Sequence, residues 1–392
     1  MIAVDEALAL IARHVRPVES EFVPLDQASG RVLAEPLHAR CDAPRQAVSA
    51  MDGYAVIEAA TAPGMPLDLI GESRAGSGFC GAVGEGQAVR IFTGAPLPAG
   101  ADYVIMQEYA RRQGDRVTFA VGYGPASYVR AQGSDFAAGA ELVPQGTKLG
   151  ARAMVAAAAA DLAEICVARR PRVAILATGD ELAAPGSAYL SCDAISESVS
   201  FGVATMVAES GGMVVTRKTG SDDLGALALA AAEALEGTDL IIVTGGASVG
   251  DRDFAKPMFA PHGLSLLFEK VAMKPGKPVW LGEAKGALVL GLPGNPTSAM
   301  VTAAIFLRPL LARLQGAQGL HRWRSLPLAT SLRETGSRET FTRARWGKAG
   351  LVPLDNQESG AQGALLEADW LIRCPPGQSA LAVGATVTAL PF

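Results

Sequence analysis

Between residues 172 and 314, short apolar runs of strand length alternate with longer segments that have a helical pattern. The runs rich in Val, Ile, Leu and Ala lie at 172–177, 214–216, 239–243, 265–272 and 287–292. The helical segments lie at 198–209, 222–236 and 296–314. Strands that alternate with helices favour a layered α/β domain, because each helix returns the chain to the same end of a mostly parallel sheet. We therefore expect a multidomain protein with such an α/β domain at its centre.

The pattern of apolar residues, Gly and Pro differs on either side of this region. Apolar residues at helical spacing predict a helix over 4–15, and an Ala-rich segment predicts another over 151–163. Between about 30 and 150, short apolar runs are broken by Gly and Pro, which is typical of antiparallel β structure. The tail beyond about 320 has the same short strands and turns, so it predicts a small β domain.

Composition limits the classes of function that remain. The chain has 392 residues, of which 49% are hydrophobic and 19% charged, so it can bury several packed cores. Lys and Arg number 34 against 39 Asp and Glu, a net charge of −5, which argues against a nucleic-acid partner. The five cysteines form no CxxC pair, so a zinc ribbon or a disulfide scaffold is not expected and a reducing compartment fits better.

No membrane segment is expected. The stretch 1–15 carries Asp5 and Glu6 and no basic residue before its apolar part, unlike a secretory signal. The uncharged run at 286–307 contains Pro293 and Pro296 around Gly294 and Asn295, so it predicts a buried strand, a turn and a core helix. These features predict a cytoplasmic protein.

Four glycine-bearing loops follow predicted strands of the α/β domain: TGDE at 178–181, TGGASVGDRD at 244–253, KPGKP at 274–278 and PGNP at 293–296. In an open α/β sheet, ligands bind at the carboxyl ends of the strands, so we expect the loops to converge there. Glycine lets main-chain N–H groups approach an anion, and lysines add positive charge. The carboxylates suit a hard cation such as Mg²⁺. The mixture predicts a site for a phosphorylated, nucleotide-bearing ligand.

Each loop also has a purely structural interpretation. A single glycine turn after a strand serves the chain reversal alone, Asp222 and Asp223 read as a helix cap, and Lys274 alone reads as a solvated lysine. Neither a Walker A loop nor a GxGxxG fingerprint is present. In the β region, SAMDGYAV at 49–56 and RIFTGAP at 90–96 read on their own as hairpin turns.

Taken together, these strings resemble the molybdopterin molybdenumtransferase family, which includes the bacterial MoeA proteins and the gephyrin E domain. The matching strings are SAMDGYAV (49–56), RIFTGAPLPAGAD (90–102), ATGDEL (177–182), TGGASVGDRDF (244–254), KPGKP (274–278) and GLPGNPTSA (291–299). They keep the family's order and spread over most of the chain.

The resemblance implies four structural parts. An elongated helix and strand domain comes from 1–44 and 138–170, and an inserted β domain comes from 45–137. A MogA-like α/β molybdopterin-binding domain spans 171–317, and a β-barrel-like domain spans 318–392. The resemblance also implies a homodimer with its active site between subunits. A MogA-like adenylyltransferase, molybdoenzyme apoproteins and chaperones are implied as further partners.

The implied reaction inserts molybdate into adenylylated molybdopterin and releases AMP, with Mg²⁺ assisting. The residues implied as catalytic are Asp52, Thr93, Glu181, Asp222, Asp253, Lys274 and Lys277. Those implied to bind the pterin substrate are Gly179, Asp180, Gly245, Gly246, Ser248, Gly250, Pro293, Gly294, Asn295, Pro296, Arg130 and Asp135. The metal ligands implied are Glu181, Asp222 and Asp253. Of all these residues, Asp52, Thr93, Arg130 and Asp135 would come from the partner subunit.

The chain departs from the family pattern in three places. Ser134 stands where a glutamate is common, Glu197-Ser198 stands where Ser/Thr-Asn is common, and the tail segment Gln357–Gly360 lacks a histidine. Two other functions therefore stay open at this point. One is a non-catalytic molybdopterin-binding carrier or regulator, and the other is a CinA-like hydrolase that uses the same α/β domain for another nucleotide.

Overall fold

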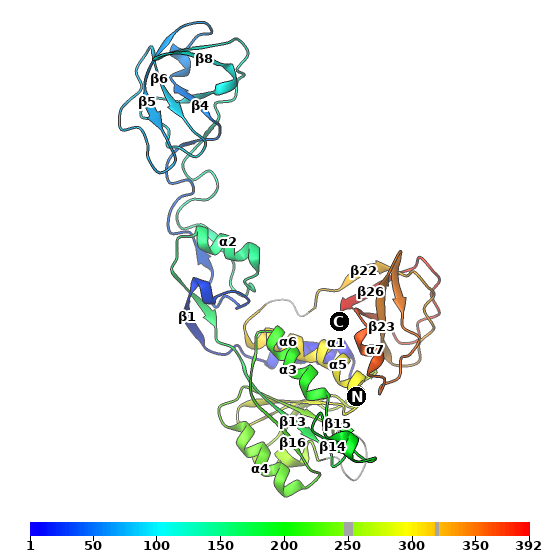
Figure 1. Ribbon diagram of the computed structural model, residues 1–392. Coiled ribbons are helices and arrows are strands. Elements are labelled where there is room, and N and C mark those ends of the chain that lie inside the picture. The colour runs from blue at the N-terminus through cyan, green and yellow to red at the C-terminus, as the bar shows by residue number, and fades with distance from the viewer. Residues whose placement is uncertain (247–253, 318–320) are drawn as a thin grey trace.

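The computed structural model describes residues 1–246, 254–317 and 321–392. Figure 1 shows an extended molecule in which a β-rich part carrying β4, β5, β6 and β8 stands at one end, above a narrow neck. Below the neck lies a small part with α2 and β1. The α/β part and the C-terminal part form the other end, where both termini lie.

The α/β part is built on a six-stranded sheet in the order β16-β13-β17-β21-β20-β18. Its strands are β13 (Arg172–Thr178), β16 (Met213–Gly220), β17 (Leu240–Thr244), β18 (Ser265–Phe268), β20 (Trp280–Ala284) and β21 (Ala287–Leu292). The four strands from β16 to β21 are parallel, and β20 runs antiparallel to both of its neighbours. This confirms the expected mostly parallel sheet, but β20 was not predicted and the strand expected at 265–272 ends at Phe268.

Helices cover both faces of this sheet. They are α1 (Val4–His14), α3 (Val199–Glu209), α4 (Leu224–Leu235), α5 (Pro296–Thr302) and α6 (Arg308–Leu314), with a π-helical turn at Ala303–Leu307. Val173 and Ile175 of β13 pack in one core with α1, α3, α5 and α6, while Ala174 and Leu176 pack with α4 on the opposite face. Because successive strand residues point to opposite faces, the apolar run of β13 supplies both cores.

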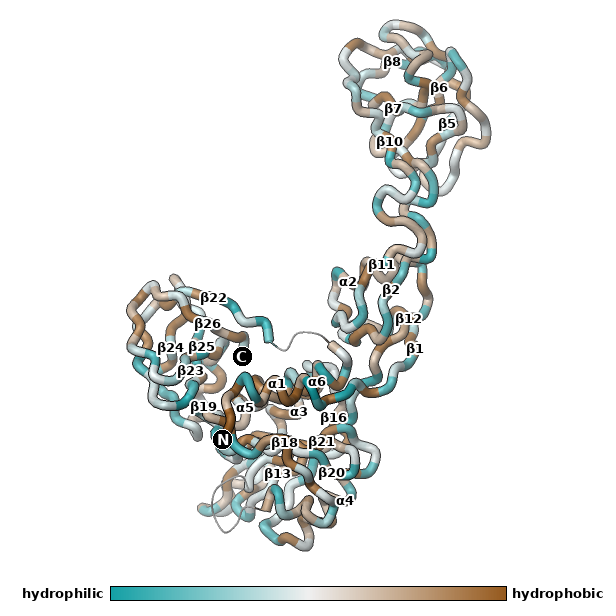
Figure 2. Tube along the Cα trace, turned by 180° about the vertical axis from the view of Figure 1, so that it is seen from behind, coloured by the Kyte–Doolittle hydropathy of each residue, from teal (hydrophilic) through white to brown (hydrophobic). Residues whose placement is uncertain are grey.

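The continuous helical run Pro296–Leu314 is long and apolar enough to cross a membrane by length and composition. However, 78% of its most apolar window is buried inside the protein. Figure 2 shows hydrophobic residues gathered where α1, α3 and α5 meet the sheet. The run is therefore a core helix of the α/β part, as the interruption by prolines and glycine predicted.

Two distant chain segments form the small part below the neck. β1 (Ser20–Pro24) pairs with β12 (Glu164–Ala168), and β2 (Leu37–His38) pairs with β11 (Glu141–Val143). α2 (Ala151–Ala159) closes a shared core with them that includes Leu33 and Ala157.

The inserted β part is a six-stranded sheet in the order β7-β4-β6-β5-β9-β8. Its strands are β4 (Gly53–Val56), β5 (Leu67–Ser73), β6 (Gln87–Ile91), β7 (Tyr103–Met106), β8 (Ala110–Gln113) and β9 (Arg116–Phe119). A separate pair, β3 (Val48–Ser49) with β10 (Val129–Arg130), lies next to it in the chain.

The C-terminal part has a sheet in the order β19-β23-β25-β26-β22, with β24 paired to β23. Its elements are β19 (Met273–Lys274), β22 (Arg324–Pro327), β23 (Glu339–Gly347), β24 (Gly350–Pro353), α7 (Gly363–Leu366), β25 (Trp370–Cys374) and β26 (Thr386–Pro391). The remaining short elements are β14 (Leu182–Ala183), β15 (Ile195–Ser196), and 3-10 turns at Leu25–Gln27, Glu58–Ala60, Gln107–Tyr109, Ala188–Leu190 and Pro257–His262.

An ion pair joins the small part to the α/β sheet. Arg169, just after β12, donates two 2.7 Å hydrogen bonds to the carboxylate of Asp239, just before β17. Asp239 also accepts the main-chain N–H of Arg172 at 2.7 Å, and Arg169 contacts Glu19 at 2.6 Å. Burial alone would raise the pKa of Asp239, but the hydrogen bonds from Arg169 and Arg172 hold it below its ordinary value.

We expect Asp239→Asn to lower the free energy of unfolding by about 1.5–3 kcal/mol, as for the loss of a hydrogen bond to a charged group. The matched control is Asp68→Asn, because Asp68 pairs with Arg116 on the exposed surface; its cost should stay below about 1 kcal/mol. Urea unfolding measures both. Since the folded pKa of Asp239 is lowered, the wild-type advantage should hold at neutral pH and shrink as the pH falls below about 4. An advantage that persists at low pH would contradict the assignment.

Candidate functional site

The carboxyl ends of three neighbouring parallel strands lie level with one another. Ala177 of β13 is paired with Thr244 of β17, and Thr244 is paired with Leu292 of β21. The loops that begin at Gly179, Gly245 and Pro293 therefore leave the sheet at one edge. This confirms the predicted convergence for three of the four glycine-bearing loops.

Glycines let two of these loops touch. A Cβ atom on Gly294 would lie 3.3 Å from the Cα of Gly245, and a Cβ on Gly245 would lie 2.3 Å from the main-chain oxygen of Thr178. Gly245 and Gly246 also have φ values of +93° and +56°, which glycine adopts without strain. The positions where side chains would otherwise stand are therefore filled by neighbouring backbone, and Gly245 and Gly246 are half-buried. The predicted residues Ser248, Gly250 and Asp253 lie outside the described residues.

The acidic residues of the TGDE loop and of the loop after β16 are brought together. Asp180 accepts the main-chain N–H of Asp222 at 2.9 Å. The carboxylate of Glu181 folds back to within 2.8 Å of the position that a Cβ of Gly179 would occupy. Asp223, not Asp222, caps α4 by accepting the N–H of Ala226 at 2.7 Å. The structural interpretation as a cap thus holds for Asp223.

The prediction that the KPGKP loop follows a strand of the α/β sheet is wrong. Lys274 is part of β19, which pairs with β23 of the C-terminal sheet and not with the α/β sheet. Gly276 has a φ of +101°, and its Cβ would lie 2.1 Å from Cγ2 of Thr302 in α5. The loop is therefore fitted closely against the helix that follows PGNP. Lys274 and Lys277 are both exposed.

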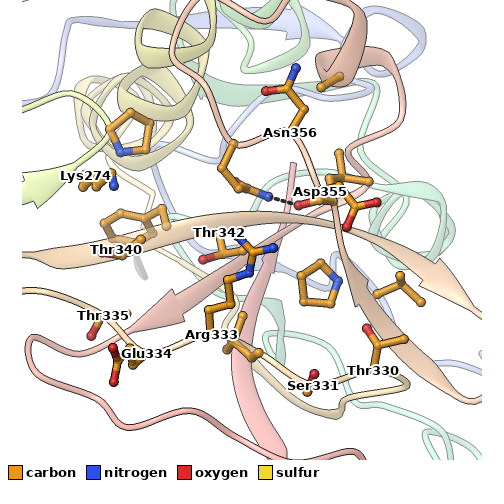
Figure 3. Close-up of a pocket in the computed structure, with 18 of the residues that line it drawn as sticks. Lys274, Thr330, Ser331, Arg333, Glu334, Thr335, Thr340, Thr342, Asp355 and Asn356 are labelled. Atoms are coloured by element: carbon orange, nitrogen blue, oxygen red, sulfur yellow. Dashed lines mark hydrogen bonds between the residues drawn. The ribbon is translucent and has the colours of Figure 1, made fainter.

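A cavity of about 1040 Å³ lies where the KPGKP loop meets the C-terminal sheet (Figure 3). In Figure 3 the side chain of Arg333 extends into its middle, with Lys274 at one side and the hydroxyls of Thr340 and Thr342 near it. The charged residues that line it are Lys274, Arg333, Arg338, Arg345, Glu334, Asp355 and Glu367. Cations and hydroxyl groups in one cavity are suited to a phosphate or another oxyanion.

Sequence reasoning missed a buried arginine beside this cavity. Arg343 of β23 is 1% exposed, and its guanidinium donates to the side-chain oxygen of Gln357 and to the main-chain oxygens of Asn356 and Glu358. None of these acceptors is a carboxylate, and burial lowers the pKa of Arg343. A buried cation bound only by neutral oxygens favours a nearby anion. Arg343 lies in no motif, so only its pairing within an apolar strand could have drawn attention to it.

The segment that Arg343 holds is bonded to the PGNP loop. The side-chain amide of Asn295 donates to the hydroxyl of Ser359 at 3.1 Å, and the N–H of Thr297 donates to the main-chain oxygen of Ser359 at 3.1 Å. Pro296 begins α5 directly after Asn295. The tail segment without the family histidine is thus next to the glycine-rich edge, and Ser359 takes part in the contact.

Asp52 and Thr93, two of the residues implied as catalytic, are hydrogen-bonded to each other in the inserted sheet, 41 residues apart in sequence. One oxygen of Asp52 accepts the main-chain N–H of Thr93 at 2.7 Å and its hydroxyl at 2.9 Å. These bonds hold the pKa of Asp52 below its ordinary value, and the charge of Arg90 lowers it further. Within one chain, this sheet stands at the far end of the molecule from β13 and β14 (Figure 1).

Arg130 and Asp135 lie at the neck, and both are exposed. Arg130 belongs to β10, and the N–H of Asp135 donates to the main-chain oxygen of Ala43 at 2.9 Å. The two strands of the neck are held by Asp42, whose carboxylate accepts the N–H of Ala138 at 2.7 Å and the side chain of Gln132 at 2.6 Å. Within one chain these residues are therefore not brought to the glycine-rich edge.

The start of α3 is one of the places where this chain departs from the family pattern, and the carboxylate of Glu197 lies there. The carboxylate of Glu197, which is 5% exposed, accepts the N–H of Ser200 at 2.8 Å and its hydroxyl at 2.5 Å. A carboxylate at a helix N-terminus satisfies a free N–H and complements the helix dipole. Glu197 thus has a structural role in this chain.

The described residues contain no cluster of three His, Cys, Asp or Glu side chains placed to hold a metal ion. Glu181 and Asp222 still supply carboxylate oxygens at the glycine-rich edge. Mg²⁺ is commonly bound by one or two carboxylates together with phosphate oxygens of a substrate. The donor chemistry therefore fits a cation that binds with a phosphorylated ligand.

Three family models match the chain. The MoeA N-terminal region (domain I and II) matches residues 2–160, the probable molybdopterin binding domain matches 174–313, and the MoeA C-terminal region (domain IV) matches 325–392.

Similar proteins match the chain over most of its length. A molybdopterin molybdenumtransferase of Haemophilus influenzae is 32% identical, with 100% of this chain and 99% of the relative covered. Another from Nostoc sp. is 35% identical, with 85% and 78% covered. A crystal structure of a molybdopterin biosynthesis MoeA protein from Pyrococcus horikoshii is 25% identical and covers 100% of both chains with a TM-score of 0.87.

We expect Gly276→Ala to destabilise the protein more than Gly286→Ala does. Both glycines have positive φ, so each alanine adds strain of about 1–2 kcal/mol. Only Gly276 has a neighbour in the way, because nothing lies within 4 Å of a Cβ on Gly286. The contact with Thr302 should add about 1–3 kcal/mol. Chemical denaturation measures the difference, and Thr302→Ser, which removes Cγ2, should recover the added part in the Gly276→Ala background. Equal losses for the two glycine variants would refute the close contact.

Proposed function

The chain belongs to the molybdopterin molybdenumtransferase family, and from that premise we propose that it inserts molybdate into adenylylated molybdopterin with release of AMP. The observation that carries the proposal is the full-length match to a molybdenumtransferase. It is combined with glycine-bearing loops that converge at one edge of the α/β sheet and with a cavity lined by Lys274 and three arginines. The carrier or regulatory alternative has no such support.

The proposed roles of the site residues differ according to their charge. Lys274 and Lys277 would bind the oxyanions of the substrates, namely phosphate and molybdate, as exposed point charges. Gly245 and Gly246, which are half-buried and carry no side chain, would let main-chain N–H groups approach the phosphate closely. Pro293 to Pro296 would shape the adjoining wall through their contact with Ser359.

The carboxylates would hold a cation and not the anion. Glu181 and Asp222, together with Asp253, would bind Mg²⁺ at the glycine-rich edge. When bound, Mg²⁺ neutralises charge at the phosphate that leaves as AMP. Asp180 would orient this group through its bond to the N–H of Asp222.

A second copy of the chain would complete the site. The Asp52–Thr93 pair is preorganised, yet it stands far from the glycine-rich edge within one chain (Figure 1). A homodimer in which the inserted part of one subunit faces the α/β part of the other supplies the missing carboxylate. Arg130 and Asp135, on the same arm, would approach with it.

The remaining partners follow from the reaction. A MogA-like adenylyltransferase would deliver the adenylylated substrate, and molybdoenzyme apoproteins or their chaperones would take the product. The proposal includes a cytoplasmic location, which the lack of a CxxC pair among the five cysteines supports. The net charge of −5 gives no support to a nucleic-acid or membrane-surface partner.

With adenylylated molybdopterin, Mg²⁺ and molybdate, we expect molybdate-dependent release of AMP that stops on chelation and returns with added Mg²⁺. Asp52→Ala and Lys277→Ala should each reduce the rate by at least about 10²-fold, as for loss of a preorganised charged group. Lys348→Ala is the matched control, since Lys348 is exposed in the C-terminal part. Pterin binding by the wild type without AMP release would favour the carrier.

Mixed dimers test the shared site. Neither Asp52→Ala nor Lys277→Ala subunits should be active alone. After denaturation and joint refolding, about a quarter of the sites should combine an intact arm with an intact loop edge, because half of randomly formed dimers are mixed. AMP release should return to about that fraction of the wild-type rate. No recovery, with mixed dimers confirmed by differently tagged subunits, would place Asp52 and Lys277 in the same chain's site.

A further inference from the structure

Arg90, in the inserted sheet, lies between two aromatic rings next to the Asp52–Thr93 pair. In the sheet register Arg90 of β6 is opposite Tyr54 of β4. Its guanidinium carbon is 5.1 Å from the ring centre of Tyr54 and 4.7 Å from that of Phe92. Two rings that contact one guanidinium restrict its position and add cation–π attraction.

The guanidinium of Arg90 is hydrogen-bonded to two residues that adjoin Asp52. One nitrogen donates to the main-chain oxygen of Gly53 at 2.7 Å, and the other donates to the side-chain oxygen of Gln107 at 2.5 Å. The N–H of Gln107 in turn donates to the main-chain oxygen of Asp52 at 3.0 Å. Arg90 therefore holds the backbone around Asp52 through two contacts. One is with the carbonyl of Gly53, the next residue, and the other is with the side chain of Gln107.

The same side chain also contacts the turn that carries the partner of Asp52. Phe92, against which Arg90 packs, immediately precedes Thr93. The turn is closed by the N–H of Gly94, which donates to the main-chain oxygen of Ser49 at 2.8 Å. On the other side, a Cβ on Gly53 would lie 2.1 Å from the main-chain oxygen of Ile105, so the chain after Asp52 cannot shift toward β7.

We propose that Arg90 is a positioning residue for the reaction, which fixes the Asp52 carboxylate and the Thr93 turn relative to each other before the second subunit is engaged. This inference rests on the proposed function. The hydrogen bonds of Arg90 within the described part of the chain go to carbonyl and amide oxygens, whereas the nearby carboxylate of Glu72 is bonded to Arg74. The positive charge of Arg90 is therefore not neutralised by an ion pair among these residues, and it acts on Asp52.

The test uses Arg90→Met, because methionine keeps an unbranched apolar stem between the rings and removes the charge and the donors. We expect the maximal rate of molybdate-dependent AMP release to fall by on the order of 10²-fold, as for a misplaced catalytic group. The KM for adenylylated molybdopterin should change by less than about threefold, since the pterin-binding loops are elsewhere. The acid limb of the pH–rate profile should move to higher pH, because the charge of Arg90 lowers the pKa of Asp52. Arg116→Met is the matched control in the same sheet and should be as active as the wild type.

A double-mutant comparison separates positioning from a general loss of structure. If Arg90 acts through Asp52, Arg90→Met should cause little further loss when added to Asp52→Asn. Arg90→Lys, which keeps the charge and one donor, should recover part of the rate, and the melting temperature of each variant reports folding. An equal loss from Arg90→Met in both backgrounds, or a changed KM with an unchanged maximal rate, would overturn this inference alone. A wild-type protein that releases no AMP would overturn the proposed function instead.

Discussion

The hydrogen bonds that run between β13, β17 and β21 set the position of three of the four glycine-bearing loops. Because these strands are parallel and in register, Ala177, Thr244 and Leu292 end at one level. The loops that follow them start side by side, and glycine at 245 and 294 allows them to approach to contact. A shift of one residue in this ladder would move the loops apart and would exchange the two faces that α1 and α4 cover.

The C-terminal part is tied to that edge by two sets of hydrogen bonds. β19 pairs with β23, and Ser359 is bonded to Asn295 and Thr297 of the segment that begins α5. The cavity is lined by Lys274 and Pro275 of the KPGKP loop together with residues of the C-terminal part. Arg343 is buried beside the cavity, and its side-chain hydrogen bonds within the described residues go to neutral oxygens.

Regular patterns in the sequence predicted the regular parts of the fold. The apolar runs at 172–177 and 287–292 became β13 and β21, since a strand buried on both faces needs a continuous apolar run. β20 was missed because Trp280 to Ala284 lies between two glycine-bearing segments, and its antiparallel pairing with β21 depends on a hairpin that periodicity does not indicate. The pairing of Lys274 with β23 and the burial of Arg343 are contacts between distant segments, which local patterns cannot specify. Only the family resemblance named Asp52 and Thr93 as site residues, because each string alone predicts a turn, and their hydrogen bonds to each other were not predicted.

The narrow neck has a mechanical consequence. The inserted sheet is carried on two chain crossings that Asp42 joins through Ala138 and Gln132. Such an arm behaves as a lever, in which a small rotation at the pivot becomes a much larger displacement at the tip. In the proposed homodimer, Asp52 has to be placed at the other subunit. The accuracy of this placement therefore depends less on the sheet that carries Asp52 than on the stiffness of a few exposed hydrogen bonds at the neck. Substitutions near residue 42 would therefore change the position of the distant Asp52 carboxylate.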